Sequence, residues 1–182
     1  MTEIRTRRLV LRLVGAPDIP RIAELGSDWD ITSMTARMPY PYTEACAADW
    51  LASIDADEVV FGITHAGSLI GVTGFAPLAN QPSHAEIGFW IGKPYWGQGF
   101  ATEAVGMLIR HCFQTTRFTR LECRHFVENE ASGNVIAKLG FVEVGRDACW
   151  CQARRLEQQA IRYELAKPRP LWRRLGLVGS AA

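Results

Sequence analysis

The sequence predicts a mixed α/β domain built on one central sheet. Segments with the two-residue alternation of strands and segments with the 3.6-residue periodicity of helices follow one another along the chain. No internal repeat or low-complexity linker divides them, and 182 residues suit one domain with a core of its own. Hydrophobic residues make up 48% of the chain and charged residues 21%, which is the composition of an ordinary globular protein.

The first third of the chain predicts one strand and two helices. A strand rich in leucine and valine at residues 8–14 precedes a short helix, which Asp18 caps and which ends near Gly26. Residues 33–42 form a loop, because two prolines interrupt regular structure there. Thr43 then caps a second helix. The apolar face of that helix comprises Ala47, Trp50, Leu51 and Ile54.

Three strands and the clearest helix fill the middle of the chain. Residues 58–65 and 68–77 form a hairpin around a tight turn. Residues 84–92 form a further strand after a polar turn. The helix at residues 101–115 has apolar side chains at the i, i+3, i+4 and i+7 positions.

The last part of the chain predicts a strand, a helix and two strands that close the sheet. These are residues 121–127, 130–139, 141–145 and 160–165, respectively. Residues 168–182 contain two prolines, three arginines and a small-residue end, which predicts either a mobile tail or a peripheral cover. The folded domain is therefore expected to span residues 1–167.

Charge and cysteine content exclude several classes of protein. The net charge of +1 provides no global field for nucleic acid or anionic lipid. No apolar run approaches the ~18 residues of a membrane span, and no secretory signal is expected. Scattered cysteines in odd number predict reduced thiols and a cytoplasmic protein, and their spacings do not predict a metal site. These are Cys46, Cys112, Cys123, Cys149 and Cys151.

A glycine-rich turn, Tyr95-Trp-Gly-Gln-Gly-Phe-Ala-Thr102, lies between a predicted strand and the clearest helix. Gly97 and Gly99 permit positive φ and close approach to a ligand. The helix that begins there directs unpaired N–H groups and the positive end of its dipole toward one point. This predicts an anion site suited to a pyrophosphate, although a tight turn without a ligand explains the glycines equally well. The turn matches neither the P-loop nor the Rossmann fingerprint.

A second element begins at Asn129, which can cap the helix at residues 130–139, with Ser132 one turn inside. A cap and a solvated serine would explain either residue alone. However, this helix and the glycine-rich turn both follow the carboxyl ends of neighbouring strands, where ligands bind in open α/β sheets. Their pairing predicts one shared ligand site.

Taken together, these motifs resemble the GNAT superfamily of acetyltransferases, whose pyrophosphate loop reads Q/R-x-x-G-x-G/A. Here Trp96 replaces the opening Q/R. The branch that acetylates the N-termini of ribosomal proteins is most similar: its T-x-R-L-x-L-R motif matches residues 6–12 and its Pro-Tyr-Thr motif matches residues 41–43. Its E-I-G-F/Y-W motif matches residues 86–90, and N-x-x-S-x-x-V-x-x-K-x-G-F matches residues 129–141.

The resemblance implies a single GNAT-like domain with a central, mostly antiparallel sheet of seven strands and about four helices. It also implies acetyl-CoA as co-substrate, without a metal. N–H groups of Ile91 and Gly92 would pair with pantetheine and stabilise the oxyanion. Ser132 would assist the leaving thiolate, because Ile136 stands where many members of the superfamily place a tyrosine acid. The implied coenzyme contacts are Ile91, Gly92, Trp96, Gly97, Gln98, Gly99, Phe100, Ala101, Thr102, Asn129 and Ser132.

The implied reaction is direct attack of a neutral amine on the thioester. A protein or peptide N-terminal α-amine, with a reference pKa near ~8, is neutral more often than a lysine near ~10.4. Glu86 is the candidate base and acceptor contact, or alternatively a structural carboxylate. Met38 and Tyr40 would line the acceptor cleft, unless their loop simply covers the core.

Other acceptors and roles stay open at this stage. An acidic patch of Asp28, Asp30 and Glu44 could attract an aminoglycoside, a polyamine or an amino acid, although solvated loop charges explain these residues equally well. A non-catalytic acyl-CoA-binding module is a further alternative, and the sequence leaves the choice between monomer and homodimer open.

Overall fold

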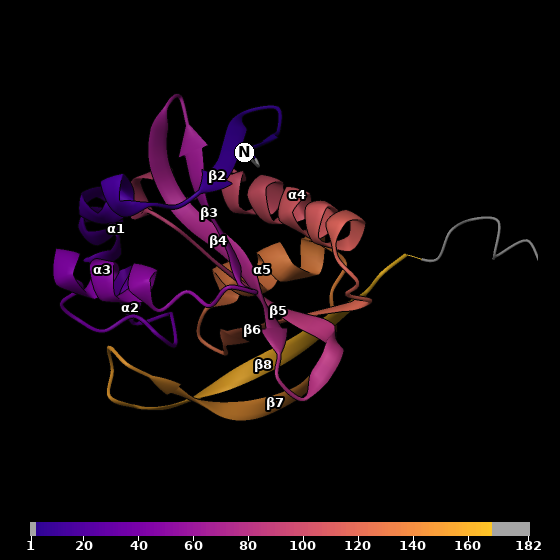
Figure 1. Cartoon of the computed structure of the whole chain (residues 1–182). Coiled ribbons are helices and arrows are strands. Elements are labelled where there is room, and N and C mark those ends of the chain that lie inside the picture. Colours follow the sequence, from indigo (N-terminus) through magenta and orange to yellow (C-terminus); the bar gives the residue numbers. More distant parts are fainter. Residues whose placement is uncertain (1–2, 169–182) are drawn as a thin grey trace, which may run out of the picture.

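The computed structural model describes residues 3–168, and a sheet of eight strands forms its centre (Figure 1). The strands are β1 (Ile4–Arg5), β2 (Leu9–Leu13), β3 (Val59–His65), β4 (Ser68–Leu78), β5 (Gln81–Ile91), β6 (Arg120–Phe126), β7 (Val142–Cys151) and β8 (Leu156–Ala166). Their spatial order is β1-β2-β3-β4-β5-β6-β8-β7. All neighbours are antiparallel except β5 and β6. The predicted mixed, mostly antiparallel sheet is confirmed, with the two-residue β1 as an additional strand.

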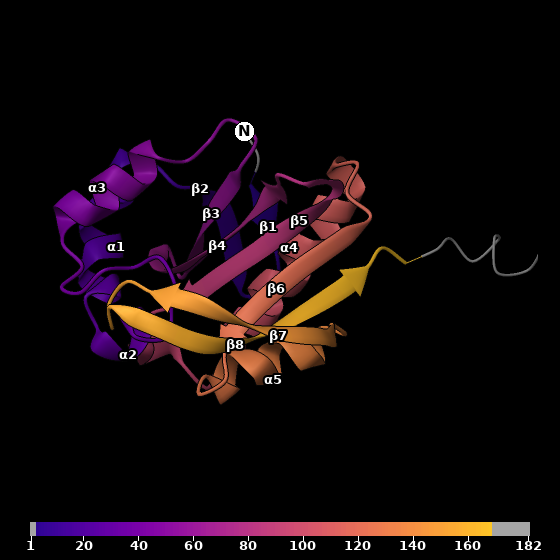
Figure 2. The ribbon, with the colours of Figure 1, turned by 90° about the horizontal axis from the view of Figure 1, so that it is seen from below.

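Helices lie on both sides of this sheet (Figures 1 and 2). They are α1 (Ile19–Gly26), α2 (Trp29–Thr32), α3 (Glu44–Ala52), α4 (Phe100–Thr115) and α5 (Glu130–Lys138), with 3₁₀ turns at Ala16–Asp18 and Lys93–Tyr95. Helices α4 and α5 pack against the central strands and share the larger core, which includes Phe61, Leu108 and Ile136. Helices α1 and α3 pack together, and α1 packs over β4, around a second core that includes Ile22 and Ala47.

The two predicted helix-cap residues, Thr43 and Asp18, differ in the hydrogen bonds that their side chains make. Thr43 caps α3 as predicted, because its hydroxyl accepts a hydrogen bond from the Cys46 N–H at 3.3 Å. Asp18 is the N-cap residue of α1, as predicted, but its side chain makes no capping bond to the helix. Its carboxylate accepts two bonds from Arg12, at 2.6 and 2.8 Å, and one from the Gly15 N–H at 3.0 Å. Asp18 therefore ties the end of β2 to the turn before α1.

The C-terminal hairpin is longer than the sequence predicts. Strand β7 has 10 residues and β8 has 11, whereas the expected strands stopped at Gly145 and began at Ala160. The register shifts between Glu143 and Gly145, and this irregularity lets the strand continue past the glycine. The predicted tail at residues 168–182 lies outside the described residues, apart from Pro168.

Strands β5 and β6 separate after a short contact. Their parallel register runs from His84–Arg120 to Glu86–Glu122. Beyond that point β5 continues to Ile91 paired with β4, whereas β6 continues to Phe126 paired with β8. The crossover through α4 accounts for the parallel direction. The carboxyl-terminal halves of these two central strands are therefore not paired with each other.

Candidate active site

The glycine-rich turn adopts the backbone conformation that its glycines allow. Gly97 has φ +74° and Gly99 has φ +77°, both in the left-handed region that other residues rarely adopt. Gly99 is the N-cap of α4 and has no side chain with which to satisfy the first N–H groups of the helix. Phe100, Ala101 and Thr102 form the first turn of α4. These N–H groups and the helix dipole form a site suited to an anion.

Trp96 fastens this turn to the end of β5. Its indole N–H donates to the carbonyl oxygen of Ile91 at 2.6 Å. The side chain of Gln98 reaches back to the Pro94 carbonyl at 3.4 Å. Trp96 therefore has a structural contact where the superfamily pattern has a polar or charged side chain.

Ile91 and Gly92 present their N–H groups to opposite edges of β5. The Gly92 N–H donates to the Ile70 carbonyl of β4 at 2.8 Å. The prediction that this group stabilises an oxyanion is wrong, because its proton is already used within the sheet. Successive residues of a strand face opposite edges, so the N–H of Ile91 faces the edge that β6 leaves unpaired. The bond from Trp96 to the Ile91 carbonyl agrees with this direction.

Glu86 lies at the last parallel pair before β5 and β6 separate. Its Oε1 accepts a hydrogen bond from Arg124 Nε at 2.8 Å, and its Oε2 lies 3.8 Å from Nη2 of the exposed Arg37. Burial works against the charge of Arg124, but Glu86, Asp147 and Cys149 together outweigh burial and raise the pKa of that guanidinium. Since Ala85 and Leu121 face the core, Glu86 and Arg124 share the opposite face of the sheet.

His84 and Glu122 form a second polar pair on this face. Nδ1 of His84 lies 3.1 Å from Oε1 of Glu122, which is buried. Glu122 is the register partner of Glu86, and His84 lies two residues before Glu86 on β5. The pair therefore extends the row of polar side chains on this face away from the point where the strands separate.

Helix α5 brings its two predicted site residues together. Asn129 is the N-cap, and its Oδ1 accepts a hydrogen bond from the Ser132 N–H at 3.1 Å. The Ser132 hydroxyl is half-buried and has no hydrogen-bond partner within residues 3–168. Ile136 is buried in the core, so its position in the helix does not face the site. The arrangement leaves the serine hydroxyl available to a ligand.

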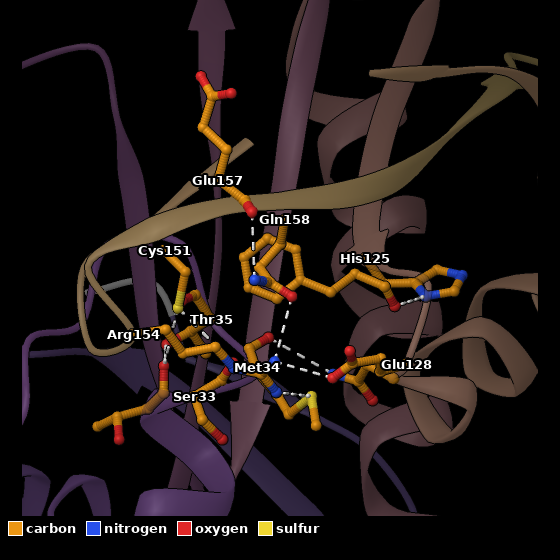
Figure 3. Close-up of polar contacts among 12 residues, drawn as sticks. Ser33, Met34, Thr35, His125, Glu128, Cys151, Arg154, Glu157 and Gln158 are labelled. Atoms are coloured by element: carbon orange, nitrogen blue, oxygen red, sulfur yellow. Dashed lines mark hydrogen bonds and ion pairs between the residues drawn. The ribbon is translucent and has the colours of Figure 1, made fainter. Parts of the chain in front are cut away.

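Three segments meet beside Glu128, the residue before Asn129 (Figure 3). From the β7–β8 turn, Arg154 donates to Glu128 at 2.8 Å and to Gln158 at 3.1 Å. The Cys151 thiol lies against backbone oxygens of the loop after α2, 3.4 Å from that of Thr35. The Asn129 amide also reaches the Met34 carbonyl at 3.5 Å. The hairpin tip, the loop and the start of α5 are thus bonded to one another.

A groove lies next to this junction. Its volume is about 480 Å³, and its lining residues are of polar or charged types apart from Val127. The lining residues are Val127, Glu128, Arg146, Glu157, Gln158 and Gln159.

The loop at residues 33–42 separates the two predicted acceptor residues. Met38 is buried among the residues of the second core, close to Gly26 and α1, so the prediction that it lines a cleft is wrong. Tyr42 is buried there too, and burial raises its pKa to about 12. Tyr40 is 47% exposed and packs edge-on against Trp29, with ring centroids 5.0 Å apart. Of the two, Tyr40 has the accessible side chain.

Sequence analysis missed the contacts that fasten β2 to α4. The Glu103 carboxylate, in the first turn of α4, accepts hydrogen bonds from the Thr6 hydroxyl at 2.6 Å, Arg8 Nε at 2.6 Å and the Arg8 N–H at 2.9 Å. Burial opposes its charge, but these bonds outweigh burial and lower the pKa of Glu103. Arg8 Nη1 also donates to the Gln98 carbonyl at 2.9 Å. The signal for these residues is the T-x-R motif at residues 6–8.

Residues 3–168 contain neither a cluster of metal-ligating side chains nor a helix that could span a membrane. They contain no group of three or more histidine, cysteine, aspartate and glutamate side chains arranged to hold a metal ion. No helix in this part of the chain is both long enough and apolar enough to cross a bilayer.

The fold and this site match one family of enzymes. The family described as the acetyltransferase (GNAT) domain matches residues 8–142, and the chain belongs to it. It is a GNAT-type N-acetyltransferase, and its co-substrate is acetyl-CoA.

Individual relatives agree with this assignment. The chain is 28% identical over 152 residues to an uncharacterized N-acetyltransferase, p20, of Bacillus licheniformis, covering 80% of this chain and 85% of the relative. It is 33% identical over 86 residues to the ribosomal-protein-serine acetyltransferase of Escherichia coli, covering 47% and 48%. Its fold matches RimL, a ribosomal L7/L12 α-N-protein acetyltransferase solved with coenzyme A, at a TM-score of 0.79, 17% identity, and coverage of 91% and 98%.

Proposed function

We propose that this enzyme acetylates the α-amine of a protein or peptide N-terminus. The observation that carries the proposal is the position of Glu86. Its carboxylate stands at the point where β5 and β6 separate, and the glycine-rich turn follows β5 along the chain as α5 follows β6. A thioester lying along the unpaired edge of β5 and an amine approaching from the charged face would meet there.

In this proposal the coenzyme follows the end of β5 to the first turn of α4. The N–H groups from Gly97 to Thr102 bind the pyrophosphate. The N–H of Ile91 faces the unpaired edge, where it hydrogen-bonds pantetheine or the developing oxyanion. Gly92 belongs to the same stretch of backbone, but its N–H is bonded to the Ile70 carbonyl and does not donate to the coenzyme.

The chemistry requires a C–N bond to form, the C–S bond to break and, in the net reaction, one proton to pass from the amine to the thiol. The neutral amine attacks the thioester carbon, a C–N bond forms and the C–S bond breaks. The proton that the amine loses passes to Glu86, directly or through water. The departing thiolate takes a proton from Ser132, and the proton held by Glu86 returns through solvent to the serine oxygen. Arg124 donates to Oε1 of Glu86, whereas Oε2 lies 3.8 Å from the exposed Arg37 and makes no hydrogen bond within residues 3–168, so Oε2 can face the acceptor. Within residues 3–168 the Ser132 hydroxyl makes no hydrogen bond that would prevent it from donating to the thiolate.

The acceptor is proposed from the relatives and from the chemistry of amines. Relatives that match about half of this chain are named for ribosomal proteins. An α-amine, with a pKa near ~8, needs less help from a base than lysine does. Tyr40, beside Trp29, offers exposed aromatic surface to the first residues of such an acceptor. Acetylation of ribosomal proteins would place the reaction in the cytoplasm.

A cationic small molecule is the weaker candidate. Its support was the acidic patch near α2, but Lys93 forms ion pairs with both Asp28 and Asp30. Those carboxylates already have a counter-charge. They therefore offer less attraction to a polyamine or an aminoglycoside than the sequence suggests.

A panel of acceptors with acetyl-CoA, followed by release of free thiol, tests this function. The panel contains peptides with free N-termini, a polyamine, an aminoglycoside and free amino acids. We expect release with peptides and little with the small amines. Preference for a small amine would overturn the proposed acceptor. Coenzyme binding without release for any amine would indicate a non-catalytic binding module.

A further inference from the structure

The glycine-rich turn supplies no cation of its own to a pyrophosphate. Trp96 stands at its first position and bonds to the Ile91 carbonyl. Lys93, the nearest preceding cation in sequence, is paired with two aspartates. Glu103 adds a negative charge in the first turn of α4, which reduces the positive potential that this helix end offers to an anion. A dianionic ligand at this site would therefore lack a counter-charge unless another part of the chain provides one.

Arg8 reaches the turn from 90 residues earlier in the chain. Its Nη1 donates to the Gln98 carbonyl at 2.9 Å, and its guanidinium carbon lies 4.6 Å above the centre of the Phe100 ring. Its Nη2 lies 3.6 Å from the position that a Cβ would take on Gly99. That nitrogen makes no hydrogen bond within residues 3–168, and the side chain is 32% exposed.

The guanidinium is held in place before any ligand arrives. Glu103 accepts from its Nε at 2.6 Å, and the Thr6 hydroxyl fixes the same carboxylate at 2.6 Å. Stacking on Phe100 limits rotation further. A planar guanidinium fixed on two sides can present its remaining N–H groups to phosphate oxygens with little loss of side-chain entropy.

We infer that Arg8 binds the pyrophosphate of the coenzyme, in place of the polar side chain that the turn lacks at Trp96. The inference rests on the proposed coenzyme site. Thr6 and Glu103 are positioning residues in this arrangement, because they hold Arg8 and do not reach the phosphates themselves. A purely structural brace between β2 and α4 is the competing interpretation of the same contacts.

Arg8→Ala and Arg8→Lys test the inference, with Arg12→Ala as the matched control. Arg12 also belongs to the β2 region and also pairs with a buried carboxylate, at 2.6 Å from Asp18, but has no contact with the turn. Calorimetry with coenzyme A should give a dissociation constant raised about tenfold to hundredfold for Arg8→Ala. The increase should be smaller for Arg8→Lys, which keeps the charge and loses the planar fork. Arg12→Ala should lower the melting temperature and leave coenzyme binding unchanged.

Acetyl-pantetheine separates phosphate binding from bracing, because it carries the thioester and has no phosphate. Arg8→Ala should lower kcat/KM for acetyl-CoA and leave kcat/KM for acetyl-pantetheine unchanged. A parallel loss with both thioesters would support the structural brace and overturn the inference. Unchanged affinity of Arg8→Ala for coenzyme A, or an equal loss in Arg12→Ala, would overturn it as well. If the wild-type protein itself failed to bind coenzyme A, that result would overturn the proposed coenzyme site as well as the inference about Arg8.

Discussion

Replacing Glu86 by glutamine separates a catalytic carboxylate from a structural one. Glutamine keeps the size of the side chain and an oxygen that can accept from Arg124, but it cannot take a proton from the acceptor amine. In the wild-type protein Arg124 Nε donates to Oε1 at 2.8 Å. The variant therefore removes the charge at the junction of β5 and β6 and changes little else.

The structure sets different magnitudes for the two roles. The side chains of Glu86 and Arg124 are 23% and 35% exposed, so weakening their ion pair should cost about 1 kcal/mol of folding free energy or less. In a chain of this size that lowers the melting temperature by about 2–4 °C. Loss of a general base should lower kcat by ~10²–10⁴-fold, which corresponds to about 2.7–5.5 kcal/mol in the transition state.

Steady-state kinetics with a saturating peptide acceptor measure the effect, and Arg124→Gln is the control. Arg124→Gln breaks the same ion pair and keeps the Glu86 carboxylate, so its kcat should stay within about fivefold of the wild type. A wild-type kcat in Glu86→Gln, with a lowered melting temperature, would refute the proposed base. Equal losses in both variants would assign the effect to the ion pair.

Three further predictions concern single residues. Ser132→Ala should lower kcat by ~10²–10⁴-fold with little change in coenzyme affinity, and an unchanged kcat would remove the serine from the proton transfer. Tyr40→Ala should raise the acceptor KM at wild-type stability, whereas Met38→Ala should lower the free energy of unfolding by about 2–5 kcal/mol and leave KM alone; the reverse pattern would contradict the positions of these side chains. Bonds from Arg12 outweigh burial and lower the pKa of Asp18 below its ordinary 3.8, so its contribution exists above that pH and disappears as the pH falls through the folded-state pKa. Asp18→Asn should therefore lose about 1–3 kcal/mol at pH 7, and urea melts should converge with the wild type in strong acid; a difference that persists there would contradict the assignment.

Local patterns were sufficient for most of the fold. The hairpin of β3 and β4, the periodic α4 and the capped α5 can each be predicted from the residues of that element alone. The end of β7 could not be predicted, because a glycine and alternating charges look like a turn. Only pairing with β8 shows that the strand continues.

Some features of the candidate site can likewise be predicted from local sequence, and others depend on the fold. The backbone of Gly97 and Gly99 and the Asn129 cap follow from local sequence. The direction of the Gly92 N–H depends on the register between β4 and β5, which the sequence of one strand does not contain. The burial of Met38 depends likewise on which core its loop crosses.

Contacts between distant segments were beyond the reach of local patterns. Arg8 and Glu103 are 95 residues apart, and in the sequence alone each looks like an ordinary charged residue of the surface. The T-x-R motif marked Thr6 and Arg8 as a group without indicating their partner. The fold supplies the reason, since their bonds to Glu103 hold β2 against the first turn of α4.

The most direct test of the proposed function uses two peptides of one sequence, each containing a lysine, with the α-amine free in one and chemically blocked in the other. Each is incubated with acetyl-CoA and the enzyme, and mass spectrometry locates the acetyl group. We expect acetylation of the free α-amine, with thiol released in equal amount, and no reaction of the blocked peptide. Equal acetylation of lysine in both peptides would contradict the proposed acceptor.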